Sequence, residues 1–112
     1  MYRVLLVDDD PHLQAANRAY LEREGYEILC AFNGEEALRL ASTARLNAIV
    51  LDVDMPGPDG VTVCRRLREV SSVPILFLSA YAETDDRIRG LLAGGDDFIA
   101  KPYSLMGLEL RL

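Results

Sequence analysis

Four short apolar runs in this 112-residue chain each end in residues that can take part in chemistry. The first run leads into Asp8 and Asp9, the second into Asp52, the third into Ser79 and the fourth into Lys101. If these runs are parallel strands, their carboxyl ends meet at one edge of a sheet, where ligands bind in open α/β folds. Carboxylates, a hydroxyl and an amine gathered there predict a magnesium-assisted phosphoryl-transfer site.

Each of these residue types has a separate role in that chemistry. Carboxylates about 4 Å apart repel by on the order of 4 kcal/mol at an effective dielectric constant of about 20, so an acidic cluster favours a bound cation. Mg²⁺ takes oxygen ligands and is commonly held by one or two carboxylates together with substrate phosphate. Asp52 can attack phosphorus, while Ser79 and Lys101 can bind the other phosphoryl oxygens. Any one acid alone is better explained as a solvated loop residue or a helix cap, so the prediction depends on the whole set.

The segments between these residues show strand and helix patterns in alternation. Apolar runs predict strands at residues 3–7, 26–31, 48–51, 73–78 and 97–100. Helical spacing predicts a helix after each strand, with the following markers: Leu13, Ala16 and Tyr20 before a stop at Gly25; residues 35–43; Val61, Cys64 and Leu67; residues 84–92; and a last helix capped by Ser104. Five strand-then-helix units predict a single α/β domain, a parallel sheet with helices on both faces, because each right-handed crossover covers one face.

Composition and charge argue against several other classes of protein. Twelve basic and 18 acidic residues give a formal net charge of -6, which does not suit a nucleic-acid-binding surface. Cys30 and Cys64 lie inside apolar patterns and lack metal-ligand spacing, which predicts reduced, buried or half-buried thiols. The first apolar run is too short for a signal peptide or a membrane span, so we expect a cytoplasmic protein that does not contact a membrane.

Taken in order along the chain, these motifs resemble the receiver domain of bacterial two-component response regulators. The resemblance covers essentially the whole sequence and rests on four segments: VDDD, LDVDMPGPDG, LSA and GGDDFIAKPY. It implies a flavodoxin-like, doubly wound sheet of five parallel strands in the order 2-1-3-4-5. It also implies a signalling switch activated by phosphorylation, and not an enzyme that turns over a substrate.

The resemblance assigns a role to each candidate residue by its position. Asp52 would accept a phosphoryl group from a sensor histidine kinase. Ser79 would be the switch hydroxyl, and Lys101 would bind the phosphoryl group. The implied cofactor is Mg²⁺, with ligands supplied by Asp8 mainly through water, by Asp9, by Asp52 and by the backbone carbonyl of Asp54.

Three further residues are expected to adjust the behaviour of this site. The side chain of Asp54 either reinforces metal binding through water or shortens the lifetime of the phosphoryl group by repulsion. Tyr81 either limits the approach of water to the site or is an ordinary surface aromatic. Phe98 stands where receivers place an aromatic switch that fills the space vacated by Ser79, although an ordinary core phenylalanine is the alternative.

Residues near the last strand and helix predict how the switch produces its output. Arg87, Asp96, Asp97 and Arg111 resemble the fourth-helix, fifth-strand, fifth-helix face of receivers of the OmpR/PhoB type, which are attached to winged-helix DNA-binding domains. The resemblance implies a homodimer through this face, with Asp97 and Arg111 of opposite subunits as the candidate charge pair. Gly107 replaces the acid that usually partners the position of Arg87, which weakens that part of the resemblance.

The last helix is short and still apolar at residue 112, which predicts a truncated receiver over residues 1–112. Its effector domain, a transcription regulator, would then be absent from this chain. A single-domain regulator is one alternative. A phosphatase of the haloacid dehalogenase type is another, because Asp52 and Asp54 fit its nucleophile motif, but Asp8 and Asp9 then stand on the wrong side of that motif. A protein-binding module without phosphorylation is disfavoured because all the chemical positions are filled.

Overall fold

The computed structural model describes residues 2–52, 60–79 and 97–100 of the chain. These residues contain five strands and three helices, in the order β1 (Arg3–Val7), α1 (Pro11–Arg23), β2 (Glu27–Ala31), α2 (Gly34–Thr43), β3 (Ala48–Asp52), α3 (Gly60–Val70), β4 (Ile75–Ser79) and β5 (Asp97–Ala100). The helices predicted at residues 84–92 and after Ser104 lie outside the described residues.

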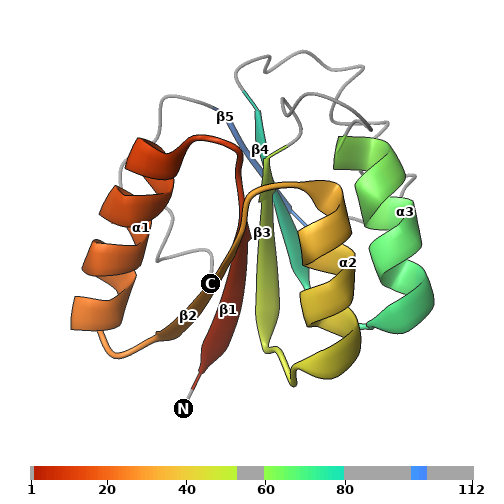
Figure 1. The fold of residues 1–112 in the computed structure, drawn as a ribbon, viewed down its shortest axis with the longest axis horizontal. Helices are drawn as coiled ribbons and strands as arrows, with labels where there is room; N and C mark the ends of the chain where they lie inside the picture. The colour runs from red at the N-terminus through yellow and green to blue at the C-terminus, as the bar shows by residue number, and fades with distance from the viewer. Residues whose placement is uncertain (1, 53–59, 80–96, 101–112) are drawn as a thin grey trace.

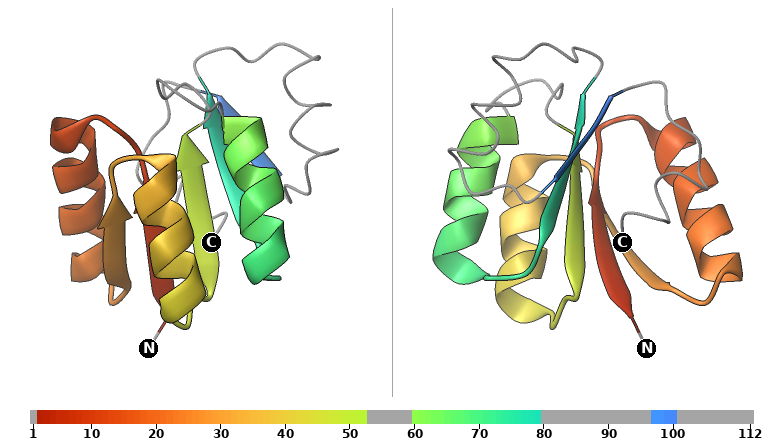
Figure 2. Two further views of the ribbon diagram at one scale, coloured as in Figure 1. Left: turned by 45° about the vertical axis from the view of Figure 1, so that its right-hand side comes forward. Right: turned by 180° about the vertical axis from the view of Figure 1, so that it is seen from behind.

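The strands form one parallel sheet in the order β2-β1-β3-β4-β5. Helix α1 covers one face, and α2 and α3 lie together on the other (Figures 1 and 2). The predicted doubly wound α/β fold and its strand order are therefore confirmed. Because β2 and β3 lie on opposite sides of β1, the order reverses between β1 and β3, which is where open sheets of this kind bind ligands.

Alternate residues of the central strands face opposite sides of the sheet, and each side buries its own apolar cluster. The cluster toward α2 and α3 takes from the strands Leu5, Val7, Ile49, Leu51, Ile75 and Phe77. The cluster toward α1 takes Val4, Leu6, Ala48, Val50, Leu76 and Leu78. Strands buried on both faces have continuous apolar sequences, which is why the predicted strand positions were nearly right.

Small differences at the strand boundaries have local causes. Strand β2 begins after Tyr26, because the Tyr26 backbone N–H donates to the Leu21 carbonyl in the turn that follows α1, at 3.0 Å. Strand β4 begins two residues later than predicted, after Pro74, which has no N–H to donate to a neighbouring strand. Asp52 and Ser79 are the last residues of β3 and β4, so the sheet itself holds their backbones.

Helix α1 lies where it was predicted, but it buries a different side from the one that its apolar residues mark. Ala16 is exposed and Tyr20 is only partly buried. The buried residues are instead Gln14, Asn17 and Leu21, two of which are polar. These also have helical spacing, so the periodicity predicted the helix correctly but not its orientation.

The described helices have short polar caps that place their starts close to the strand ends. The Asp10 side chain caps α1, and Pro11 follows at the first helical position. The Asn33 side chain caps α2 by accepting from the Glu36 backbone N–H at 2.9 Å. Gly25, the predicted stop after α1, has φ of +98°, a conformation that glycine adopts without strain.

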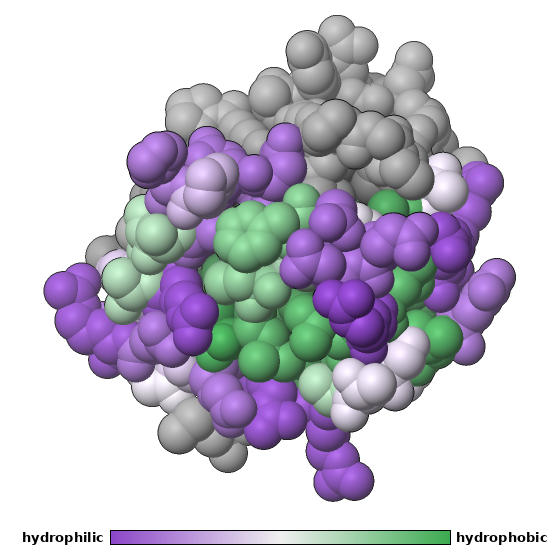
Figure 3. Space-filling model, in the orientation of Figure 1, coloured by the Kyte–Doolittle hydropathy of each residue, from purple (hydrophilic) through white to green (hydrophobic). Residues whose placement is uncertain are grey.

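Apolar side chains gather in the middle of the face shown in Figure 3, with hydrophilic residues around them. Among the described residues, the large apolar side chains that are exposed are Tyr2, Phe32 and Val70. None of the helices described here has the length and apolar character needed to cross a membrane. The buried apolar residues described here lie in the two clusters on either side of the sheet.

Candidate functional site

The register of β1 and β3 brings two of the predicted site residues, Asp8 and Asp52, together. Val7 pairs with Leu51, so Asp8 and Asp52 follow side by side at the carboxyl ends of neighbouring strands. That end of the sheet is uppermost in Figure 1. Both carboxylates are buried, with Asp8 4% exposed and Asp52 2% exposed. Burial of two acids at adjacent strand ends is costly unless other groups compensate their charge.

A third acid completes the cluster. One carboxylate oxygen from each of Asp8, Asp9 and Asp52 lies within 4.8 Å of the others, and Asp9 is exposed. Hard divalent cations take carboxylate oxygens as ligands and keep the rest of their coordination shell for water or phosphate. The donor set therefore fits Mg²⁺ or Ca²⁺, with Asp9 on the side that is open to solvent.

Hydrogen bonds fix the turn that carries two of these acids. The Asp10 backbone N–H donates to Asp8 Oδ1 at 3.0 Å. Asp10 Oδ1 in turn accepts from the backbone N–H groups of His12 and Leu13 at 2.9 and 3.3 Å. These hydrogen bonds hold the Asp8 carboxylate against the turn that leads directly into helix α1.

The strand register also fixes where the backbone of Ser79 lies relative to Asp52. Asp52 pairs with Leu78, and the following residue, Ser79, pairs with Ala100 at the end of β5. Ser79 therefore ends a strand next to the one that ends at Asp52. Lys101 follows Ala100 in the sequence but lies outside the described residues.

The remaining predicted site residues fall wholly or partly outside the described part of the chain. Asp97 and Phe98 are backbone residues of β5, and Phe98 pairs with Phe77 of β4. The other residues in this group lie outside the described ranges: Asp54, Tyr81, Arg87, Asp96 and Arg111. Their roles stay predictions.

Residues 4–112, nearly the whole chain, match the response regulator receiver domain family. The acidic cluster and the strand order agree with this match. The chain belongs to this family. The match agrees with the receiver prediction and counts against the haloacid dehalogenase alternative.

Curated relatives of this receiver are named as transcriptional regulators. The chain is 44% identical over 110 residues to the transcriptional regulatory protein ResD of Bacillus subtilis, which covers 98% of this chain and 46% of ResD. It is 46% identical over 111 residues to the transcriptional regulatory protein PrrA of Mycobacterium tuberculosis, covering 98% of this chain and 48% of PrrA. The receiver thus spans about half the length of these relatives.

Solved receiver structures have the same fold and, in two cases, a metal ion. The receiver domain of the sensor histidine kinase PA1611 from Pseudomonas aeruginosa, with magnesium coordinated in its active-site cleft, has a TM-score of 0.88 and 34% identity, covering 98% of this chain and 93% of that one. A response regulator from Burkholderia pseudomallei with a phosphorylated aspartic acid, calcium and citrate has a TM-score of 0.92 and 26% identity, covering 97% of this chain and 65% of that one.

Sequence reasoning missed Gln14, a polar residue of the receiver that contacts the backbone of the site. Gln14 is 2% exposed, and its side-chain amide donates to the Asp8 carbonyl at 3.2 Å. A glutamine six residues after the acid has no chemical motif to mark it. The available signal was the i, i+3, i+7 spacing of Gln14, Asn17 and Leu21, which matches a helical face as well as the apolar residues do.

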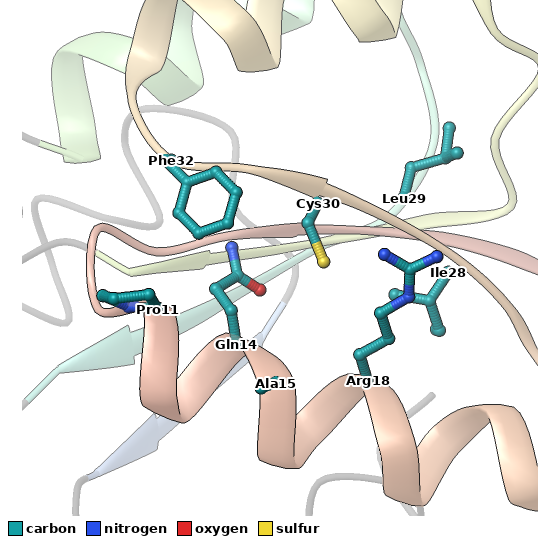
Figure 4. A pocket seen from close by; sticks show the side chains of 8 residues that line it. All are labelled: Pro11, Gln14, Ala15, Arg18, Ile28, Leu29, Cys30 and Phe32. Atoms are coloured by element: carbon teal, nitrogen blue, oxygen red, sulfur yellow. The ribbon is translucent and has the colours of Figure 1, made fainter.

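A separate pocket of about 370 Å³ lies between α1 and β2, and none of the three acids lines it. It is lined by Pro11, Gln14, Ala15, Arg18, Ile28, Leu29, Cys30 and Phe32 (Figure 4). Burial raises the pKa of the Cys30 thiol, and the positive charge of Arg18 partly offsets that shift. Both Cys30 and Cys64 are free thiols, as predicted.

Proposed function

We propose that Asp52 of this receiver accepts a phosphoryl group while Mg²⁺ is held by Asp8, Asp9 and Asp52. The observation that carries the proposal is the approach of these three carboxylates to within 4.8 Å at the ends of β1 and β3. The magnesium in the cleft of the PA1611 receiver and the phosphorylated aspartic acid of the Burkholderia regulator support it.

The buried acids explain why a cation is part of the proposal. When bound, Mg²⁺ would offset the negative charge of the carboxylates and of the incoming phosphoryl group. Asp9, which is exposed, would supply a ligand from the solvent side. Asp8 is buried and would act mainly through water, and the backbone carbonyl of Asp54 would complete the proposed ligand set.

The chemical step is carried by Asp52. One carboxylate oxygen forms a bond to phosphorus, while the bond between phosphorus and an imidazole nitrogen of the kinase histidine breaks. The released nitrogen takes up a proton from solvent. Asp52 is 2% exposed, so the donor must approach from the open side of the acidic cluster. Lys101 and Ser79 would bind the remaining phosphoryl oxygens.

We further propose that phosphorylation is read out by Ser79 and Phe98. Ser79 ends β4 and Phe98 lies in β5, so the two residues belong to neighbouring strands. The register pairs Phe98 with Phe77, one strand further into the sheet from the edge. Movement of Ser79 toward the phosphoryl group would then allow Phe98 to change position.

The proposed output is control of an attached effector domain in a transcription regulator of the OmpR/PhoB type. The relatives named as transcriptional regulators support this output, and the chain spans about half of their length. A homodimer through Arg87, Asp96, Asp97 and Arg111 belongs to the same proposal. So do phosphorylation by a sensor histidine kinase and a cytoplasmic location.

The test is intact mass spectrometry after incubation with acetyl phosphate and Mg²⁺. We expect one phosphoryl group to be added to the parent protein and none to Asp52→Asn or to the parent in the presence of a chelator. Asp10→Asn is the matched control: it changes an acid beside the cluster but keeps a side chain that caps α1 equally well, so it should still be phosphorylated. An adduct that survives in Asp52→Asn would overturn the assignment.

A further inference from the structure

Gln14 is a buried polar side chain on the face of α1 that packs against the sheet. It is 2% exposed and is the sole glutamine of the chain. Figure 4 shows its side chain directed from α1 toward the strands. A buried amide in this position needs hydrogen-bond partners, because an unpaired one would destabilise the fold.

The amide nitrogen meets three backbone carbonyls from two strands and the turn beyond one of them. Gln14 Nε2 donates to the carbonyls of Leu6, Asp8 and Ala31 at 3.0, 3.2 and 2.9 Å. A primary amide has two N–H groups, so the three acceptors share two protons. The Ala31 carbonyl also accepts from the Asp8 backbone N–H at 3.1 Å. Asp8 is thus held through both its N–H and its carbonyl.

The other half of the amide shows that this orientation is enforced. Gln14 Oε1 is buried and has no hydrogen-bond partner among the residues that the structure describes. Reversing the amide would direct Oε1 at three carbonyl oxygens, which would repel it. A buried acceptor without a partner destabilises the folded state. The fold accepts that cost and keeps the donor at the end of β1.

The contact closes a loop of hydrogen bonds around the acids. Besides the side-chain bond to the Asp8 carbonyl, the Gln14 backbone N–H donates to the Asp10 carbonyl at 3.0 Å. The Asp10 backbone N–H donates to the Asp8 carboxylate at 3.0 Å. Asp9 lies within this loop, so its backbone position depends on contacts made by Gln14.

We propose that Gln14 is a positioning residue that holds the peptide at Asp8, and thereby sets the Asp8 and Asp9 carboxylates at the distance from Asp52 that a divalent cation needs. This inference rests on the proposed function, because it concerns the same acidic cluster. Hydrogen-bond partners of metal ligands commonly alter metal affinity by about 10- to 100-fold when they are removed.

The first test is Mg²⁺ affinity of the metal-free protein, measured by isothermal titration calorimetry. Gln14→Met keeps the length of the side chain but removes both donors, and we expect its affinity to fall by about tenfold. The matched control is Leu21→Ala, on the same buried face of α1 but in the apolar cluster, where Leu21 is 0% exposed. Its affinity should stay within about twofold of the parent's, even though its stability falls.

The outcomes separate the two proposals. If the parent binds no Mg²⁺, the proposed function fails. If the parent binds and Gln14→Met binds equally well, the positioning role alone fails. An equal loss of affinity in Leu21→Ala would also overturn it, because the effect would then be one of general stability.

A second measurement is made on the parent protein, so it does not require that a Gln14 variant folds. Because Gln14 is the sole glutamine, its side-chain NH₂ gives one identifiable pair of NMR signals in the parent protein. We expect these protons to exchange slowly with solvent in the metal-free protein and to shift when Mg²⁺ is added. Fast exchange, or signals unmoved by saturating Mg²⁺, would overturn the proposal.

Discussion

The two faces of the sheet are covered by helices of different character. Helix α1 buries Gln14, Asn17 and Leu21, so most of its buried residues are polar. The residues that α2 and α3 contribute to the other cluster are apolar or cysteine: Ala37, Ala41, Val63, Cys64 and Leu67. One face is held mainly by apolar packing, while the other combines packing with hydrogen bonds to the strand ends. From this difference we expect that stability and site geometry can be changed separately in this receiver.

The largest effect on stability should come from the apolar face. Leu67 is 0% exposed in the cluster beneath α2 and α3, and Leu67→Ala should lower the free energy of unfolding by about 2 to 5 kcal/mol, measured by urea denaturation. Mg²⁺ affinity of the folded variant should remain that of the parent, because Leu67 is on the face opposite α1. A parallel loss of affinity would break the separation between the faces.

Metal binding should stabilise the parent through the acids at the ends of β1 and β3. Mg²⁺ at about 100 times its dissociation constant should raise the free energy of unfolding by about 2.7 kcal/mol. Asp9→Asn removes an exposed proposed ligand, so most of this gain should disappear in urea titrations with and without Mg²⁺. Asp10→Asn serves as the control and should keep the full gain. Equal stabilisation of Asp9→Asn and the parent would remove Asp9 from the ligand set.

Close packing on the apolar face should appear at Gly34. A Cβ added there would lie 2.9 Å from Val63 Cγ2, so the Val63 side chain or the two helices would have to shift. Gly34→Ala should lower the free energy of unfolding by about 1 to 2 kcal/mol. In a thermodynamic cycle, Gly34→Ala should cost less when it is made in a Val63→Ala background. Strict additivity would show that the two helices are not in tight contact.

The smallest effect is a difference between two thiols on opposite faces. Cys64 is 0% exposed among the apolar residues beneath α2 and α3, and it should resist iodoacetamide until the protein unfolds. Cys30 is partly exposed near α1, but burial raises its pKa, so little thiolate forms at neutral pH. Its alkylation should be slow near pH 7 and accelerate at higher pH than that of an ordinary thiol. Equal rates for both thiols in folded protein would contradict the comparison.

The strands and the acidic cluster could be predicted because each depends on a short-range pattern. Runs such as residues 48–51 are apolar throughout, since both of their sides are buried. Parallel strands end at the same edge, so Asp8 and Asp52 could be placed together before the register was known. This reasoning needs only the strand ends and not the side-chain packing.

The role of Gln14 could not be predicted, because its partners belong to different parts of the chain. Its amide meets carbonyls of Leu6, Asp8 and Ala31, and the last of these is 17 residues away. A polar residue in a helix is usually exposed, and backbone carbonyls leave no mark in the sequence. The orientation of α1 was missed for the same reason, since Gln14 and Asn17 face the sheet in place of apolar residues.

The strand order has a consequence for how the protein is made. Residues 3–52 contain the adjacent strands β2, β1 and β3, helices α1 and α2 for the two faces, and the acids Asp8, Asp9 and Asp52. Because synthesis proceeds from the N-terminus, this half of the sheet leaves the ribosome first. The three acids of the proposed cation site can therefore come together before Ser79 and Lys101 have left the ribosome.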